Sequence, residues 1–549
     1  MRHQSRTTRA LPVLREPVQP AGGAASARGP RVGIITLGCD KNTVDSERIG
    51  AWLAGAGARV AEGAKGADVV VINTCGFIDI AKEESIEALL EAVRLKAEGR
   101  VRAVVAMGCL VQRYKEELAR ELPEVDLFLG LTEAGRLVEE LRSRGLLESR
   151  VGAPAPGQPL RLHSSRRHTS FLKVSEGCDH ACTFCAIPLM RGKHRSAPIE
   201  QLVREAQELE AAGVVELGLV SQDTTWYGRD LFQRQSGVAG GAGDGISPSG
   251  LGRTAEGTAD AAASRGDGLF VGRPFARMAG VDAGIDAWTV RPAMVAGANG
   301  RERRGPRTGM LCELLEALLA ETTIPWFRLF YMYPSGIQRD LVELMAREPR
   351  IVPYLDMPIQ HGSDAVLKRM RRPERRATIR ERVQWLRDAV PDLALRTTVI
   401  VGFPGETEED FEALLDLLEE IRFDRVGAFA FSPEEGTPAA EMPDQVPDEV
   451  KRERLERLED LQRGITLERN EAQVGRELVV LVDRAASEGG EGVAVGRSWR
   501  DAPEVDGAVL IRGAAGVRAG EFVRVRVTGA DEHELTGDFI EKVDWRGGR

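Results

Sequence analysis

Residues 175–185 read SEGCDHACTFC, and this stretch decides how the rest of the chain is interpreted. Cys178, Cys182 and Cys185 have a CxxxCxxC spacing and follow a short apolar run that is typical of a strand. Three thiolates this close cannot all pair as disulfides, and they are one ligand short of a closed tetrahedral site. The spacing favours an iron–sulfur cluster that keeps one metal position open. A zinc knuckle is the alternative, although no fourth ligand follows and His180 is expected to be solvated.

Length and composition set the class of protein. The 549 residues predict three or four domains, and 42% hydrophobic residues are ordinary for a soluble globular chain. A formal net charge of −10 weighs against broad electrostatic binding to nucleic acid. No apolar run is long enough to cross a membrane. Seven cysteines without a secretory signal predict a reducing, cytoplasmic setting, and nothing in the sequence demands more than a monomer.

Two segments are expected to lack a fold of their own. Residues 1–30 are basic and rich in Ala, Gly and Pro, which predicts a disordered tail. Residues 233–309 hold 17 glycines in 77 positions, against 60 in the whole chain, and show little apolar periodicity. This composition predicts a flexible insertion. The arginines of its basic end, 301–307, allow the interpretation that the insertion is an arm that contacts ribosomal RNA. The favoured interpretation is a solvated spacer.

Residues 31–148 alternate between strand and helix patterns. The apolar runs 31–37, 68–72 and 103–106 suit strands buried on both faces, and helical patterns cover 45–53 and 83–95. A parallel sheet with covering helices follows from this alternation. A cysteine comes just after each of the three runs: Cys39, Cys75 and Cys109. Because the carboxyl ends of parallel strands share one edge, we expect a second three-thiolate site there; three inert buried cysteines are the alternative.

Residues 164–460 form a second strand–helix series. The predicted strands are 169–174, 214–220, 326–332, 354–357, 395–401 and 425–431, with helices such as 198–212 and 407–421 between them. Six such units predict a partial, open (β/α) barrel whose site lies at the carboxyl ends of the strands. The CxxxCxxC loop and several polar or glycine-rich segments follow these strands and are expected to share one mouth. Cys312 lies in an amphipathic helical pattern and is expected to be a core residue.

The C-terminal region, 471–546, predicts a small all-β barrel of the OB-like kind. Five short alternating runs, with turn residues between them, cover 478–482, 492–496, 508–511, 521–527 and 535–540. Such barrels often bind RNA. Residues 471–549, however, hold 15 Asp and Glu against 11 Lys and Arg, a poor charge balance for gripping phosphates.

Tail and insertion aside, the chain resembles the methylthiotransferase branch of the radical S-adenosylmethionine (SAM) enzymes over almost its full length. That branch has an N-terminal three-cysteine domain, a CxxxCxxC barrel and a C-terminal TRAM barrel, in this order. Within it, three stretches are similar to the RimO type: 37–47 (LGCDKNTVDSE), 221–228 (SQDTTWYG) and 354–361 (YLDMPIQH). The tRNA-modifying type usually has Gln-Met-Asn where this chain has Asp40, Lys41 and Asn42. The RimO type usually has proline in place of Asp40.

This resemblance implies two 4Fe–4S clusters. Cys178, Cys182 and Cys185 would hold the cluster whose fourth iron binds SAM, and Cys39, Cys75 and Cys109 an auxiliary cluster that carries the sulfur. Reductive cleavage of SAM would give a 5′-deoxyadenosyl radical, which abstracts hydrogen from the β-carbon of an aspartate in ribosomal small-subunit protein twelve. That bond is out of reach of side-chain acids and bases, so the cofactor must carry the chemistry. Two SAM are consumed per product, with electrons from a reductase.

The resemblance also suggests which residues contact SAM. Phe184 would pack beside the adenine, and Glu216, Gln222 and the 398–402 segment with Thr398 and Gly402 are further candidates. Ordinary strand-end and turn roles are the alternative for all but Phe184, and Gly402 is more easily understood as shaping the backbone. Two other functions stay open: a tRNA adenosine methylthiotransferase, and a non-catalytic iron–sulfur protein that binds RNA through the TRAM-like barrel.

Overall fold

The computed structural model describes residues 29–147, 160–163, 168–231, 309–486 and 492–545. The predicted tail and insertion lie outside these ranges, apart from residues 29, 30 and 309. None of the helices in the described ranges combines the length and the apolarity that a membrane crossing requires.

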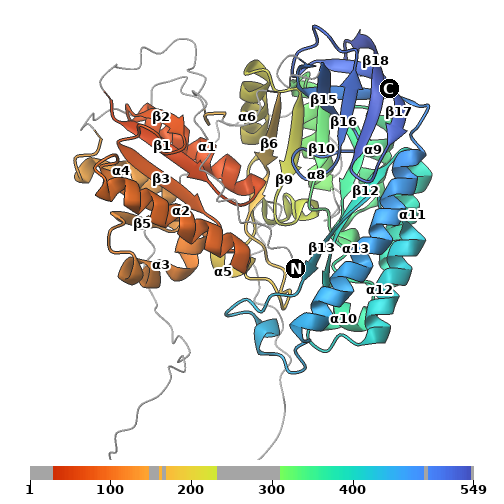
Figure 1. Cartoon of the computed structure of the whole chain (residues 1–549), viewed down its shortest axis with the longest axis horizontal. Coiled ribbons are helices and arrows are strands. Elements are labelled where there is room, and N and C mark those ends of the chain that lie inside the picture. Colours follow the sequence, from red (N-terminus) through yellow and green to blue (C-terminus); the bar gives the residue numbers. More distant parts are fainter. Residues whose placement is uncertain (1–28, 148–159, 164–167, 232–308, 487–491, 546–549) are drawn as a thin grey trace, which may run out of the picture. The chain divides into compact units, whose positions relative to one another are not determined.

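The N-terminal region forms a five-stranded parallel sheet in the order β2-β1-β3-β4-β5 (Figure 1). Its strands are β1 (Arg31–Thr36), β2 (Arg59–Glu62), β3 (Val69–Thr74), β4 (Ala103–Gly108) and β5 (Leu127–Leu129). β3 and β4 are buried along their whole length, as strands covered on both faces must be. The predicted parallel sheet is confirmed, and β2 and β5 are added at its two edges.

Helices cover both faces of this sheet. α1 (Asp40–Gly55) and α4 (Leu137–Ser143) pack on one face, through residues such as Leu53 and Leu141. α2 (Asp79–Ala97) and α3 (Cys109–Glu121) pack on the other, through residues such as Leu89 and Leu110. A short 3-10 helix, η1 (Leu131–Arg136), leads into α4. The two apolar layers fix the sheet, so that the ends of its strands form one rigid edge.

The central region is an open sheet of six parallel strands in the order β13-β12-β11-β10-β9-β6. The strands are β6 (Thr169–Lys173), β9 (Glu216–Val220), β10 (Trp326–Leu329), β11 (Ile351–Asp356), β12 (Ala394–Val401) and β13 (Arg425–Ala430). Each strand pairs with the preceding one in sequence, as in a (β/α) barrel that does not close. The predicted partial barrel is confirmed. A small antiparallel sheet of two short strands, β7 (Ser175–Glu176) and β8 (Arg195–Ser196), encloses the cysteine loop.

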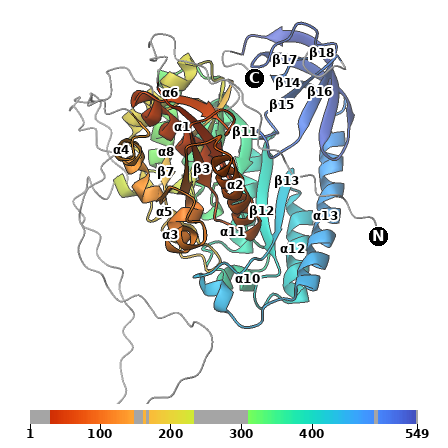
Figure 2. The same ribbon diagram turned by 60° about the vertical axis from the view of Figure 1, so that its left-hand side comes forward.

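Helices alternate with these strands, and one large apolar core lies between helices and sheet. Figures 1 and 2 show α12 and α13 side by side along β13. The α-helices are α5 (Ile187–Arg191), α6 (Ile199–Ala211), α8 (Gly309–Glu321), α9 (Arg339–Arg347), α10 (Asp364–Arg369), α11 (Arg376–Ala389), α12 (Glu408–Ile421) and α13 (Asp448–Glu471), and the 3-10 helices are η2 (Thr224–Trp226), η3 (Pro334–Gly336) and η4 (Pro438–Glu441). Cys312 is half-buried against the core from α8, in line with its predicted packing role.

The C-terminal region is a closed five-stranded barrel in the order β14-β15-β16-β18-β17, which confirms the prediction for this region. Its strands are β14 (Glu477–Arg484), β15 (Val493–Ser498), β16 (Ala508–Arg512), β17 (Phe522–Ala530) and β18 (Glu534–Val543). Only β16 and β18 pair in parallel. Alternate residues of the strands, such as Val480, Val523 and Val525, fill the interior.

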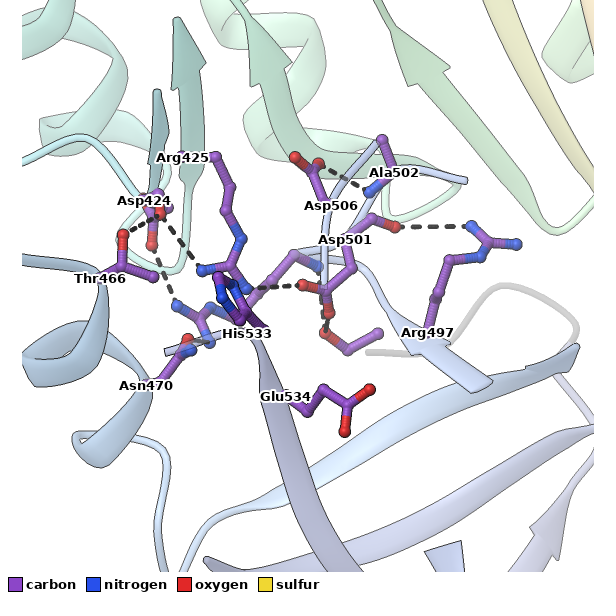
Figure 3. A network of polar contacts seen from close by, with 12 residues as sticks. Asp424, Arg425, Thr466, Asn470, Arg497, Asp501, Ala502, Asp506, His533 and Glu534 are labelled. Atoms are coloured by element: carbon purple, nitrogen blue, oxygen red, sulfur yellow. Dashed lines mark hydrogen bonds and ion pairs between the residues drawn. The ribbon is translucent and has the colours of Figure 1, made fainter. Parts of the chain in front are cut away.

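A network of buried polar contacts holds this barrel against the amino ends of the central strands (Figure 3). Asp424, just before β13, accepts hydrogen bonds from Arg469 of α13 at 2.8 Å and from Arg500 at 3.1 Å. Arg425 pairs with Asp501 at 3.3 Å. A cavity of about 350 Å³ opens beside this network, but its charged lining pairs internally, as Arg476 does with Asp392. We interpret the network as a structural interface between the C-terminal barrel and the central sheet rather than as a reaction site.

Candidate active site

The three N-terminal cysteines meet at the carboxyl edge of their sheet. Cys39 follows β1 and precedes α1, Cys75 directly follows β3, and Cys109 begins α3 directly after β4. These strands are neighbours, with Thr36 level with Asn73 and Thr74 level with Gly108. Cys75 packs against the backbone of Gly38, where an added Cβ would stand 2.8 Å from its sulfur. The sheet therefore brings together three cysteines that are far apart in sequence.

Asn42, in the first turn of α1, ties the three cysteine segments to one another. Its side chain is fully buried, and Nδ2 donates to the carbonyl of Leu37 at 2.7 Å and to that of Thr74 at 3.2 Å. Its Oδ1 lies 3.9 Å from the sulfur of Cys109. One carboxamide thus touches the segments that carry Cys39, Cys75 and Cys109, and it fixes their spacing.

Burial shapes the acidity of these thiols. It raises the pKa of Cys75, and it raises that of Cys109 to about 12, with Cys39 and Cys75 adding to the effect and Arg191 opposing it. Burial likewise raises the pKa of Cys178 and of Cys185 to about 12. A metal must displace these protons on binding, because the thiolate is the ligand.

The CxxxCxxC loop follows β6, the first strand of the central sheet. Cys178 and Cys182 are buried and Cys185 is half-buried. The loop is fixed at both ends, because Cys178 N donates to Gly192 O at 3.0 Å and Thr183 bonds to the carbonyls of Arg369 and Met370. Gly177 has φ +74° and lies so close to the Lys193 carbonyl that a Cβ would clash. Only glycine allows the loop to start here.

His180 is not solvated, and the prediction for this residue was wrong. Its Nε2 lies 2.7 Å from Asp223 Oδ2, and its ring stacks on Tyr333 with centroids 4.4 Å apart and contacts Trp226 at 3.9 Å. Arg372 lies over the Tyr333 ring at 3.8 Å. Burial opposes the charge of Arg372, but Tyr333, Glu374 and Cys182 raise its pKa above the ordinary value. A layer of half-buried aromatic rings, with the buried Arg372 beside it, therefore packs against the cysteine loop.

The remaining candidate SAM contacts lie in or after strands of the same sheet. Gln222 follows β9, and its Oε1 is buried without a hydrogen-bond partner in the described part of the chain. Thr398 lies on the less buried face of β12, level with Gly427 of β13. Phe184 packs half-buried against an apolar group that includes Phe403 and Phe431. A ligand with polar and aromatic parts requires both kinds of surface, an unpartnered acceptor and an apolar group.

Glu216 has a different environment from the one expected. It starts β9 and is level with Thr169, at the strand end opposite the cysteine loop. Its carboxylate pairs with Arg328 at 2.9 Å and with Arg497 of the C-terminal barrel at 2.7 Å. Gly402 has φ +72° and packs on the aliphatic part of Lys451, which fits a role in shaping the backbone. We leave Glu216 out of the candidate site.

The two cysteine sites touch through the helix that follows the CxxxCxxC loop. In α5, Met190 packs with Ala186 against Cys109. Arg191, at the end of α5, donates to Asn42 Oδ1 at 2.6 Å and pairs with Asp45 at 3.2 Å and Glu176 at 2.8 Å. The side chain of Arg191 is 1% exposed. A single guanidinium therefore joins the edge that carries Cys39 to β7, the short strand that starts the second cysteine loop.

A second link comes from the residues that follow Cys39. Lys41 is buried, and its ammonium lies 3.3 Å from the centre of the Tyr331 ring, which follows β10. The Tyr331 hydroxyl donates to Asp40 Oδ2 at 3.2 Å. Burial lowers the pKa of Lys41, while the charges of Cys39 and Asp40 act in the opposite direction. The cysteine-bearing edge of the N-terminal sheet thus contacts the carboxyl ends of the central strands.

Each of the two cysteine sets would suit an iron–sulfur cluster that keeps one iron open. In each set, three cysteine sulfurs come from segments that other side chains hold rigidly, and no fourth cysteine is near in sequence. Within the described ranges, no three His, Cys, Asp or Glu side chains are grouped closely enough for a single metal ion. A 4Fe–4S cluster would take each thiolate on a different iron, so its three ligands need not converge on a single metal ion.

The sequence did not single out Asn42, Arg191, Arg372 or Tyr333 as parts of the site. Asn42 was noted only as part of a family motif, and its role depends on partners at residues 37, 74 and 191. One sequence signal could have pointed to them. A polar or charged residue next to a cysteine segment that is expected to be buried must find a hydrogen-bond partner within the site.

Three family models match successive parts of the chain. Residues 31–130 match the uncharacterized protein family UPF0004, residues 172–234 and 306–418 the radical SAM superfamily, and residues 474–540 the TRAM domain. Among solved structures, that of the radical S-adenosylmethionine methyltransferase TsrM from Kitasatospora setae is similar over 73% of this chain and 72% of its own, at 12% identity and a TM-score of 0.46.

Curated relatives match over almost the whole chain. The ribosomal protein uS12 methylthiotransferase RimO of Desulforudis audaxviator is 42% identical over 93% of this chain and 97% of its own. The corresponding protein of Symbiobacterium thermophilum is 40% identical over 95% and 93%, and that of an Anaeromyxobacter species 42% identical over 93% and 93%. With these identities over both full lengths, the chain belongs to the RimO family of methylthiotransferases, which are radical SAM enzymes.

Proposed function

We propose that this enzyme adds a methylthio group to the β-carbon of an aspartate in ribosomal protein uS12, the small-subunit protein twelve. Its relatives are named for that substrate, which supports the choice. The observation that carries the proposal is the contact between two three-cysteine sites through Arg191, Asn42 and the Met190–Cys109 packing. A reaction that joins a radical step to the transfer of sulfur needs two such sites next to each other.

The chain's residues have separable roles in this proposal. Cys178, Cys182 and Cys185 hold one 4Fe–4S cluster, and Cys39, Cys75 and Cys109 hold the auxiliary one. When bound, the clusters and two SAM per turnover supply the carbon radical chemistry and the methylated sulfur. Asn42 spaces the auxiliary cysteines through its bonds to Leu37 and Thr74.

Other residues prepare the mouth for SAM. Gln222 offers its free acceptor to the ligand, and Phe184 of the cysteine loop and Thr398 of β12 are further contacts. The segment after β12 is held by Glu406, which accepts from Phe403 N at 2.9 Å and pairs with Arg454 at 2.9 Å. Gly402 contributes by shaping the backbone of this segment, because its φ of +72° favours glycine. Apolar side chains such as Phe403 and Phe431 exclude water from one side of the mouth.

The test is the intact mass of uS12 after anaerobic incubation with reconstituted enzyme, SAM and a reductant. We expect one hydrogen of one aspartate to be replaced by one methylthio group, and peptide sequencing to place the change on that residue. Production of 5′-deoxyadenosine with no change in uS12 would refute the substrate and direct the search to adenosine in tRNA. If neither 5′-deoxyadenosine nor product formed, a non-catalytic RNA-binding role would become the better account.

The proposal includes partners beyond the substrate. An electron-donating reductase is required, because SAM cleavage in this family is reductive. A ribosomal substrate places the reaction in the cytoplasm. All the cysteines of both sites come from one chain, so a monomer suffices.

A further inference from the structure

Lys41 is unlike the other buried cations between the N-terminal and central regions. Lys173 pairs with Asp45 and Glu176, Arg191 pairs with the same two carboxylates, and Arg48 pairs with Glu205 at 2.9 Å. Lys41 is just as buried, with 4% of its surface exposed, but in the described part of the chain its ammonium makes no ion pair and no hydrogen bond. Its one close partner there is the Tyr331 ring, at 3.3 Å.

The nearest carboxylates are already engaged. Asp356, at the end of β11, accepts from Arg396 at 2.9 Å and from Tyr331 N at 3.2 Å. Asp40 accepts the Tyr331 hydroxyl. An aromatic face gives an ammonium only part of what a carboxylate gives, and a buried charge without an anionic partner is costly. The ammonium of Lys41 therefore has the capacity to bind one more anion.

The position of Lys41 fits a substrate site. It stands two residues after Cys39 of the auxiliary site, and it reaches over Tyr331 at the carboxyl ends of the central strands. A substrate that reacts with groups at both sites must pass between them. Under the proposed function, on which this step rests, the reacting carbon of the substrate is directly bonded to a carboxylate.

We propose that the ammonium of Lys41 binds the carboxylate of the substrate aspartate and so determines the preference for an acidic side chain. A charge-assisted hydrogen bond at the carboxylate positions the β-carbon, which is bonded to the carboxylate carbon. Lys41 is thus a substrate-binding residue. The competing explanation is a structural one, in which Lys41 only balances the charge of the Cys39 thiolate.

The test compares wild-type enzyme with Lys41→Met and Lys41→Arg. Binding of fluorescently labelled uS12, and of a uS12 version with asparagine at the modified position, is measured by anisotropy before and after cluster reconstitution. We expect Lys41→Met to weaken binding of the aspartate form about 10- to 100-fold and to leave the asparagine form almost unchanged. Lys41→Arg should keep the preference for aspartate. Lys65→Met, the same substitution at an exposed lysine, is the control and should bind as wild type does.

Iron content separates the two explanations. If Lys41→Met loses auxiliary iron and binds both uS12 forms equally less well than wild type, Lys41 has the structural role and the inference is wrong. If wild type binds the two forms equally, the inference also fails, while methylthiolation of uS12 keeps the proposed function intact. If wild type neither binds nor modifies uS12, the proposed function fails and this inference with it.

Discussion

Arg191 donates a hydrogen bond of 2.6 Å to the carboxamide oxygen of Asn42, across 149 positions of sequence. Arg191 ends the helix that follows the CxxxCxxC loop, and Asn42 lies in the turn that follows Cys39. The two cysteine sites therefore share one hydrogen bond, and both its members are buried. A substitution of either residue should therefore alter the structure of both cysteine sites.

Replacing Arg191 by methionine should cost stability and uncouple the two half-reactions. The substitution leaves Asp45 and Glu176 with Lys173 alone, and breaking a buried ion pair from one side costs about 3–5 kcal/mol. We expect a lower free energy of unfolding in urea and less methylthiolated uS12 per 5′-deoxyadenosine formed. Arg94→Met removes an exposed ion pair with Glu91 and should change neither quantity. An unchanged product ratio in Arg191→Met would show that the residue has only a structural role.

The two cysteine sets should fail in different ways. Cys109→Ala is expected to lose about half of the bound iron, to abolish methylthiolation and to keep 5′-deoxyadenosine formation, since the SAM site retains all three ligands. Cys182→Ala should abolish 5′-deoxyadenosine formation as well. Both are measured by iron analysis and chromatography of the nucleoside. Cys312→Ala, in α8, should behave as wild type. If Cys109→Ala also stopped SAM cleavage, the proposed division of roles would be wrong.

The sequence predicted the parts of the fold that local patterns determine. β3 and β4 are continuous apolar runs, and each is followed by its cysteine, so both the strands and the shared edge could be foreseen. β2 and β5 were missed because they are short, and β2 shows only one buried position in four. The registers of the sheets, which set how Cys39, Cys75 and Cys109 lie relative to one another along the predicted edge, follow from the whole fold rather than from any local signal.

Side-chain partners were the least predictable feature. His180 was expected in solvent, but Asp223, Tyr333 and Trp226 come to it from other loops. Glu216 was expected at SAM because it belongs to a barrel strand, yet which end of the strand it occupies depends on where the strand begins. Its partner Arg497 lies 281 positions away in another region. Ion pairs between residues this far apart in the sequence produce no periodic pattern from which they could be predicted.

Glu216→Gln tests whether Glu216 stabilises the interface with the C-terminal barrel or contacts SAM. The substitution removes the carboxylate that pairs with buried Arg328 and leaves buried Arg497 with Asp483 alone, so the free energy of unfolding should fall by about 3–5 kcal/mol. At temperatures where the variant is folded, its KM for SAM and its rate of 5′-deoxyadenosine formation should match wild type. Glu541→Gln, in an exposed pair with Arg524, is the matched control and should leave stability unchanged. A raised KM for SAM in Glu216→Gln would restore Glu216 to the cofactor site.

His163 should make the stability of the protein depend on pH near neutrality. Burial lowers its pKa, with Arg161 and His168 acting in the same direction and Glu47 and the hydrogen bond with Thr169 O opposing them. A histidine with a lowered folded-state pKa binds fewer protons when folded than when unfolded. Its contribution to stability is therefore complete above the unfolded pKa of about 6.5 and is lost as the pH falls through the folded-state value.

The measurement is the urea midpoint of wild type and His163→Asn at about pH 7.5 and about pH 5.5. The midpoint of the wild type should fall on acidification by more than that of the variant, because the variant has no proton to bind at this position. His533→Asn, at an exposed histidine before β18, should follow the wild-type curve. Equal losses in wild type and His163→Asn would mean that His163 is protonated alike in the folded and unfolded chain, and that Glu47 and the hydrogen bond with Thr169 O fully offset burial.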